Sequence, residues 1–304
     1  MLRILDARTG EPVPAAPARR GLTRIEAHAG RLDPTALRVL LTADLLVRAL
    51  ELGGTPVWTI LTSPRDHPEL RTAATRLAIR PFEDAHDLAS GLGESQAIHV
   101  AQRGTENALG EGPVVGVGAV EWAGDAGPAG DERERSGGES GRPDGAGEVR
   151  GAGAGAGVGA GADAGAGRRS TRGDVHCAAA PAGPSALPVL LSDPSALRLA
   201  LLAVPRSEPV RLDPAVLEDA ARSLARWRRS VAGWARQPSR PVPGEVRERL
   251  RAAWEDDLDL PAVLGVLRDA ENAPGIADGA RFETFAYADR LLALDLARDI
   301  GGPA

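Results

Sequence analysis

The chain has 304 residues, of which 43% are hydrophobic, so it is long and apolar enough for one or two packed cores and is not wholly disordered. It carries 42 acidic against 36 basic residues, and every basic residue is arginine because the sequence contains no lysine. No region has the positive charge excess of a dedicated nucleic-acid-binding domain. The single cysteine, Cys177, excludes an internal disulfide and a multi-thiolate zinc site.

The first residues show no basic segment followed by an apolar run, and the chain has no apolar stretch of about eighteen residues. We therefore expect a cytoplasmic protein that does not insert into a membrane.

Glycine content divides the chain into three segments. Residues 123–180 contain a long glycine and alanine repeat, which loses too much backbone entropy on ordering to bury a core. We predict a disordered linker or insertion there. It separates a degenerate nucleotide-binding-type α/β domain in residues 1–122 from a helical bundle in residues 181–304.

In the first domain, the pattern predicts a strand over Leu22–Ala27, a helix over Pro34–Glu51 with Asp33 as its N-cap, and a strand over Pro56–Leu61. A strand, a helix and a strand within about forty residues form a right-handed crossover, which implies a parallel sheet. Farther along, the expected elements are helices over 69–77 and 82–90 and strands over 97–101 and 113–120.

The second domain has almost only helical periodicity. Helices are predicted over 194–203, 214–236, 245–254, 259–272 and 280–299. In the 214–236 segment, apolar residues alternate at steps of three and four from Leu217 to Trp234, which is typical of a buried seam. The acidic cluster of Asp256, Asp257 and Asp259 precedes the next helix, and we interpret it as N-capping. Together these segments predict an antiparallel bundle.

Three segments of the second domain, Asp193–Trp227, WEDDLDLPAVLGVLRDAEN and FAYADRLLALDL, follow one another in a familiar order. They resemble the connection into the first bundle helix, a later helix start and the ending of class I cysteinyl-tRNA synthetases. The opening LRILDARTGEPVP resembles the family's N-terminus. The family includes a sister enzyme that joins cysteine to a sugar amine in mycothiol synthesis. The resemblance implies a truncated Rossmann-type synthetase domain followed by the family's post-catalytic bundle, and it implies ATP-dependent cysteine ligation.

The motifs that carry this chemistry in the family are largely missing. Its ATP-binding turn, His-Ile-Gly-His, corresponds here to HAGRLDPTAL, which keeps only His28 and Gly30 as a weak remnant. A chain without lysine lacks the Lys-Met-Ser-Lys-Ser loop, and one cysteine cannot build the family's thiolate zinc site. His99 with Glu106 and Asn107 faintly resembles a third motif. We therefore assign no catalytic residue, no metal and no cofactor.

One helix face is a candidate for binding nucleic acid. Arg222, Arg226, Arg229 and Arg236 repeat at helical spacing in the 214–236 segment, where they would contact the phosphates of a tRNA. The alternative is an ordinary solvated face opposite the apolar seam.

Three functional hypotheses follow. The favoured one is a non-catalytic scaffold that binds tRNA, a nucleotide or a protein partner, and a related one is a structural or assembly role in which the bundle docks on another synthetase. The alternative is an active ligase that uses ATP to attach cysteine to tRNA or to a mycothiol-type sugar amine. In that case relocated catalytic groups would include Arg19, Arg20, Arg24 or Arg31.

Overall fold

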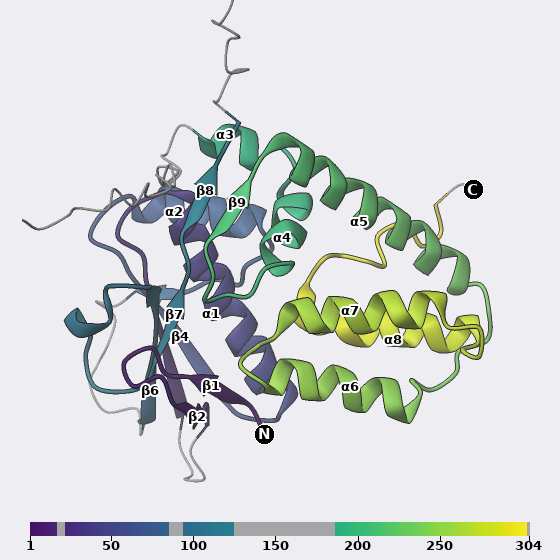
Figure 1. Ribbon diagram of the computed structural model, residues 1–304, viewed down its shortest axis with the longest axis horizontal. Coiled ribbons are helices and arrows are strands. Elements are labelled where there is room, and N and C mark those ends of the chain that lie inside the picture. Colours follow the sequence, from purple (N-terminus) through teal and green to yellow (C-terminus); the bar gives the residue numbers. More distant parts are fainter. Residues whose placement is uncertain (17–21, 85–93, 125–185, 303–304) are drawn as a thin grey trace, which may run out of the picture. The chain divides into compact units, whose positions relative to one another are not determined.

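A five-stranded parallel sheet forms the centre of the N-terminal part (Figure 1). The computed structural model describes residues 1–16, 22–84, 94–124 and 186–302, which all fall in one compact unit. The strands in spatial order are β5 (Glu83–Asp84), β4 (Val57–Thr62), β3 (Leu22–His28), β6 (Glu94–Gln102) and β7 (Val114–Val117). All four neighbouring pairs are parallel, which confirms the predicted α/β class.

Helix α1 (Pro34–Leu52) connects β3 to β4 and packs on the sheet. The Asp33 side chain accepts a hydrogen bond from the backbone N–H of Ala36 at 2.8 Å, and Pro34 occupies the first helical position, where its missing N–H has no cost. Nearly every residue of α1 is buried, because the sheet covers one side of the helix and α2 (His67–Arg76) and α8 (Asp278–Leu292) contact others. The predicted helix is confirmed.

One local prediction needs correction, and one pair of strands was not predicted. The helix expected over 82–90 does not begin there, since Glu83 and Asp84 instead extend the sheet by pairing with Ile60 and Leu61 of β4. Pairing with an existing strand thus overrides local helical propensity. The rest of that segment lies outside the described residues. The sequence also did not reveal the N-terminal antiparallel pair of β1 (Arg3–Leu5) and β2 (Pro12–Pro14).

The N-terminal part and the helical part are joined by a second parallel strand pair (Figure 1). Strand β8 (Val120–Trp122) follows β7, and its partner β9 (Val210–Leu212) comes after the short helices α3 (Leu187–Leu190) and α4 (Pro194–Leu202). The predicted linker, residues 123–180, lies outside the described residues except at its first two positions.

Buried arginines strengthen this junction. Arg38 of α1 donates to the backbone carbonyls of residues 118, 204, 205 and 208, and burial lowers the pKa of this side chain to about 10. Arg206 donates to the carbonyl of Gly116 at 2.7 Å and pairs with Asp257. Since these carbonyls receive charged donors, the two parts are held by directional bonds as well as by apolar contact.

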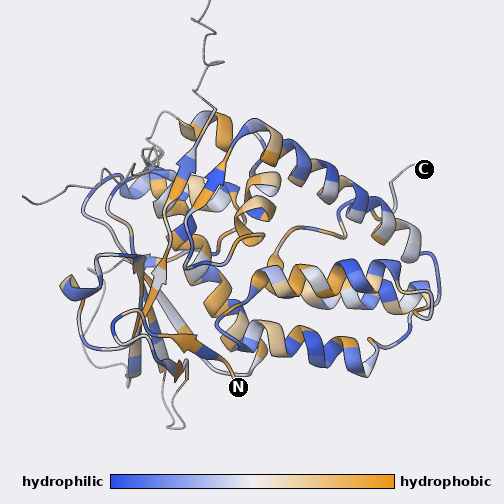
Figure 2. Cartoon of the chain, in the orientation of Figure 1, coloured by the Kyte–Doolittle hydropathy of each residue, from blue (hydrophilic) through white to orange (hydrophobic). Residues whose placement is uncertain are grey.

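Helices α5 (Pro214–Trp234), α6 (Gly244–Glu255), α7 (Leu260–Asn272) and α8 (Asp278–Leu292) form the predicted bundle. The rings of Trp227 and Trp234 stand edge-on to Phe285, with centroid distances of 5.7 and 5.1 Å, so the predicted seam is the packed interior. Figure 2 shows the contrast between the apolar α4 and the largely polar α6.

The last helix is shorter than the sequence predicted. Helix α8 ends at Leu292 because Ala293 adopts a left-handed conformation at φ 48°. The Asp289 carboxylate then accepts the N–H groups of Leu294 and Leu296 at 2.7 and 2.9 Å, which turns the chain away from the helix axis.

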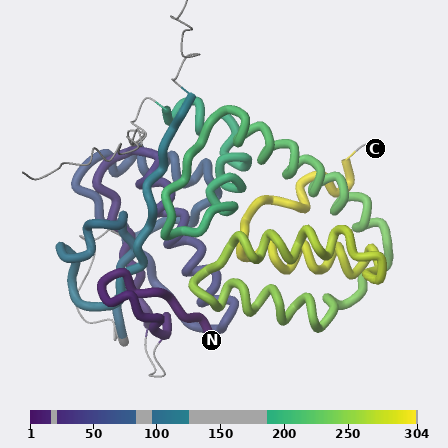
Figure 3. The backbone as a smooth tube through the Cα atoms, in the orientation of Figure 1, coloured from purple at the N-terminus to yellow at the C-terminus, as the bar shows by residue number. Residues whose placement is uncertain are grey.

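The N-terminal segment runs beside the end of α6, as Figure 3 shows. The N–H of Asp257 donates to the carbonyl of Arg3 at 2.9 Å, and the Asp257 carboxylate accepts from Leu5. Asp259 accepts from Ala262 at 3.0 Å and so caps α7, which confirms the capping interpretation for this residue. Among the helices described, none is both long and apolar enough to cross a bilayer.

Candidate functional site

A cavity of about 620 Å³ opens at the carboxyl ends of the central strands. The chain order reverses between β3 and β6, and in an open parallel sheet ligands bind in the crevice at such a reversal. The lining comes from the ends of three strands, the first turn of α1 and the loop after β6. It includes His28, Gly30, Arg31, Asp33, Thr62, Arg65, Gln102 and Thr105. Both residues of the expected ATP-motif remnant, His28 and Gly30, therefore lie at this cavity.

Three ligand-type side chains meet beside the cavity. The Nε2 atom of His28 lies 3.0 Å from Nδ1 of His99, and the Oε2 atom of Glu26 lies 3.2 Å from Nδ1 of His99 and 3.5 Å from Nε2 of His28. Glu26 and His99 are direct partners in the β3–β6 register, and His28 follows Glu26 by two residues on the same face of β3. The sheet itself fixes this cluster.

Hydrogen bonds outside the cluster orient its members. Nε2 of His99 lies 3.0 Å from the carbonyl of Glu111. Since a carbonyl only accepts, this nitrogen carries a proton, and in the neutral ring the lone pair is on Nδ1. The Nε of Arg24 pairs with Oε1 of Glu26 at 2.8 Å, which leaves Oε2 facing the histidines. Nδ1 of His99, Nε2 of His28 and Oε2 of Glu26 thus converge, and either a proton on one of the two ring nitrogens or a cation has to lie between them.

The pKa shifts describe the cluster without a metal, where a proton on Nδ1 of His99 is donated to Glu26. The hydrogen bond with His99 lowers the pKa of Glu26, and the charges of His99 and Arg24 act in the same direction while burial opposes them. Burial lowers the pKa of His28, and His99 adds to that shift. At neutral pH, Glu26 is therefore a carboxylate and His28 is a neutral imidazole, the forms that bind metal ions.

The sequence predicted no metal site because His28 and His99 are 71 residues apart. A weaker signal was present: Arg24, Glu26 and His28 alternate with apolar residues along a central strand, and His99 lies in the middle of another apolar strand. Polar side chains at such positions are costly to bury and indicate a site. Of the remaining histidines, His86 and His176 lie outside the described residues.

The N-terminus of α1 is capped by the carboxylate of Asp33. Oδ1 of Asp33 accepts from Ala36, and its Oδ2 pairs with Nε of Arg31 at 3.1 Å. In the family's motif this helix end stabilises phosphate, whereas here the negative Asp33 side chain meets the positive end of the helix.

The arginines proposed for an alternative pyrophosphate site do not form a cluster in the described residues. Arg24 pairs with Glu26 and Arg31 pairs with Asp33, while Arg19 and Arg20 lie outside the described part. Glu106, from the third motif, accepts the N–H of Gly104 through both carboxylate oxygens and so stabilises the turn after β6.

The candidate nucleic-acid face on α5 is partly neutralised. Arg222 pairs with Glu218 and Asp219, and Arg226 pairs with Glu271 at 3.3 Å. Arg229 and Arg236 are exposed and make no ion pair among the described residues. Two of the four arginines thus have no acidic partner among the described residues and remain available to pair with a binding partner.

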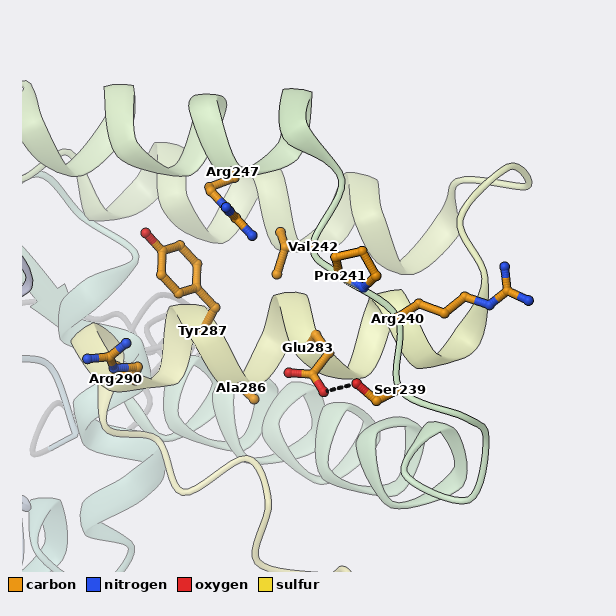
Figure 4. A pocket seen from close by; sticks show the side chains of 9 residues that line it. All are labelled: Ser239, Arg240, Pro241, Val242, Arg247, Glu283, Ala286, Tyr287 and Arg290. Carbon is orange, nitrogen blue, oxygen red and sulfur yellow. Dashed lines mark hydrogen bonds between the residues drawn. The ribbon is translucent and has the colours of Figure 1, made fainter.

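A second cavity of about 440 Å³ lies in the bundle between α6 and α8 (Figure 4). Arg247 and Tyr287 point into it, but Arg240 points away, and Glu283 accepts a hydrogen bond from Ser239 at 2.6 Å across one side. Its charges are therefore mixed and partly satisfied, and its lining residues do not include three metal-ligand side chains of the kind that meet at Glu26, His28 and His99.

Comparison with known proteins shows relatives over part of the chain. No family model matches it. Three bacterial proteins match parts of it. Each is named L-cysteine:1D-myo-inositol 2-amino-2-deoxy-alpha-D-glucopyranoside ligase. The protein from Parafrankia sp. is 40% identical over 89 residues, which is 29% of this chain and 19% of that protein. That from Streptomyces griseus is 36% identical over 110 residues, or 34% of this chain and 25% of that protein.

The third, from Thermobispora bispora, is 36% identical over 92 residues, or 28% of this chain and 22% of the relative. The chain thus spans about a fifth to a quarter of the length of the curated relatives it matches. The expected resemblance to cysteine ligases of the mycothiol type is confirmed for this shared portion.

Proposed function

We propose that this chain is a cysteine-ligase-like scaffold that binds a nucleotide-sized ligand in the cavity above β3 and β6 and does not catalyse ATP-dependent ligation. The observation that carries the proposal is Asp33 at the N-terminus of α1. A triphosphate bound at this helix end would meet a fixed carboxylate, and like charges at such short range repel each other. Catalysis of ATP-dependent ligation would require this same end of the helix to stabilise the reacting phosphate.

The composition of the chain supports a loss of catalysis. Ligases of this kind accelerate adenylate formation by placing positive groups where charge develops on the leaving pyrophosphate. The chain has no lysine for this purpose, and both described arginines of the alternative site are paired with acids. Its single cysteine also leaves the thiolate zinc site of the family without donors.

The cavity itself favours a small molecule over a macromolecule as the ligand. Its volume falls in the range typical of small-molecule sites, and Gln102, Thr105 and Arg65 supply a few polar contacts on a mainly apolar wall. A nucleotide with few phosphates fits this combination of apolar surface and limited positive charge.

Calorimetric titration with adenosine, AMP and ATP tests the proposal. AMP is expected to bind, and ATP is expected to bind no more tightly than AMP. Asp33→Asn keeps an N-cap acceptor but removes the charge, so it should raise ATP affinity by about tenfold, which is ~1.4 kcal/mol. Tighter binding of ATP than of AMP to the unchanged chain would contradict the repulsion argument.

Gly30→Leu provides a blocking variant. A Cβ at Gly30 meets no atom within 4 Å, so the larger side chain enters the cavity without distorting the backbone. Gly275→Leu is the matched control, because a Cβ there also meets nothing within 4 Å and Gly275 does not line the cavity. Loss of AMP binding in the first variant only would support the cavity as the site, and equal binding in both would reject it.

The alternative is an active ATP-dependent cysteine ligase, which the names of the relatives favour. Cysteine-dependent exchange of pyrophosphate into ATP separates the two, with a genuine cysteinyl-tRNA synthetase as the positive control. Exchange above background would overturn the scaffold proposal. A folded protein without exchange would support it, and salt-sensitive retention of tRNA that is lost on Arg229→Ala would add tRNA as a partner.

A further inference from the structure

We propose that Glu26, His28 and His99 form a three-ligand site for a divalent transition metal, with zinc as the best match. The inference is independent of the nucleotide proposed above, because it rests on the donor atoms and their positions alone. Their ligand atoms lie within 4.8 Å of one another on two adjacent strands. The donor set is two imidazoles and one carboxylate, which differs from the thiolate set implied by the family resemblance.

The spacing of the three atoms fits one ion. The separations are 3.0, 3.2 and 3.5 Å. Ligands bound tetrahedrally to zinc at 2.0–2.1 Å lie roughly 3.3 Å apart, so a point about 2 Å from all three atoms exists without any movement of the strands.

The surroundings hold the donors in the orientation that a metal requires. A metal-binding histidine usually donates its second N–H to a carbonyl or a carboxylate, and a metal-binding carboxylate is itself hydrogen-bonded. Nε2 of His99 meets the carbonyl of Glu111, and Oε1 of Glu26 meets Arg24. His99 is only 3% exposed, so its ring has no freedom to turn away. These contacts place the remaining lone pairs of both residues at the common point.

The fourth position of the ion would face the cavity. His28 is the member of the cluster that lines the cavity, whereas the loop at Gly110 and Gly112 lies against the far side of the His99 ring. Three protein ligands with one position left open to a cavity is the arrangement of metal sites that bind a further ligand. The proposed ion would therefore take water, or a donor atom of a bound molecule, at that position.

The competing occupant is a proton, either on Nε2 of His28 or on Nδ1 of His99, that is shared within the cluster. Metal analysis of the tag-free full chain distinguishes them. After incubation with zinc and removal of the excess by gel filtration, one zinc per chain is expected, with at least a tenfold loss of affinity in His28→Gln and Glu26→Gln. His67→Gln is the matched control, since it removes a histidine of α2 outside the cluster and should bind zinc as the unchanged chain does.

Cobalt(II) gives a second readout that does not depend on loss of function. The unchanged chain should show the intense visible bands of a four-coordinate ion. His28→Cys should add a sulfur-to-cobalt charge-transfer band in the near ultraviolet, because a thiolate would then replace the imidazole. Circular dichroism checks that each variant is folded. Less than a tenth of a zinc per chain, equal zinc in the His28→Gln and His67→Gln variants, or no new band in His28→Cys would overturn the proposal.

Discussion

Replacing Arg198 with methionine removes a buried cation that joins several elements of the fold. Its Nε donates to the carbonyl of Leu292 at 2.6 Å, and a second nitrogen donates to the carbonyl of Leu77 at 2.7 Å. A third donates to Oδ2 of Asp44 at 3.1 Å. Burial lowers the pKa of Arg198, and the charge of Asp44 counteracts this shift. One side chain of α4 is thus tied to α1, to the end of α2 and to the end of α8.

Methionine has a similar volume but no donor, so both carbonyls lose a partner inside the protein. Asp44 keeps Arg48, which pairs with it at 2.8 Å, so its charge is not left alone. Removing one partner of a buried pair costs about 3–5 kcal/mol, and the retained Arg48 places the expected loss near the middle, at ~4 kcal/mol. That is a large share of the 5–15 kcal/mol typical of a whole domain.

Urea denaturation at neutral pH, followed by circular dichroism and by tryptophan fluorescence, measures the loss. Both signals should shift together, because the cation links the sheet to the bundle. Arg222→Met is the control: its ion pairs are on the exposed surface of α5, so the change should stay within about 0.5 kcal/mol. A loss below ~1 kcal/mol, or two separate transitions, would refute the reasoning.

Two smaller perturbations test other contacts. Gly279→Ala places a Cβ 1.9 Å from the carbonyl oxygen of Pro238, so thermal denaturation should show a loss of about 1–3 kcal/mol that Gly275→Ala does not share. Burial raises the pKa of Asp289 above 3.8, so the folded state holds this proton more tightly than the unfolded state. The stability of the unchanged chain relative to Asp289→Asn should therefore fall as pH rises above about 4, and a rising difference in urea titrations would contradict this.

Local signals predicted most of the fold. Asp33 and Pro34 mark the start of α1 through capping chemistry that acts within one helical turn, and the seam at Trp227 follows from periodicity within α5. The prediction failed where partners distant in sequence decide the structure. Glu83 and Asp84 join the sheet because β4 offers an open edge, and nothing in the local pattern carries that information.

The candidate site, too, could be predicted from the sequence only in part. His28 and Gly30 were found by resemblance, and both line the cavity. The contact between His99 and His28 could not be predicted from the sequence. It depends on β6 pairing beside β3, and several other elements separate these two strands along the chain. Arg198 was missed for a related reason: in a chain without lysine, a structural arginine looks like any surface arginine until its burial is known.

The two proposals together imply that zinc and AMP strengthen each other's binding. Without a metal, Asp33 at the cavity and Glu26 beside it are offset by their ion pairs with Arg31 and Arg24, so AMP binds without the help of a net positive charge from these groups. A divalent ion held by Glu26 and two neutral imidazoles changes the charge of the cluster from about −1 to about +1. Zinc should therefore tighten AMP binding in calorimetry but leave uncharged adenosine nearly unaffected. In His28→Gln the zinc effect on AMP should disappear. An equal effect of zinc on both molecules would show that the ion acts on the fold and not through the charge of the cavity.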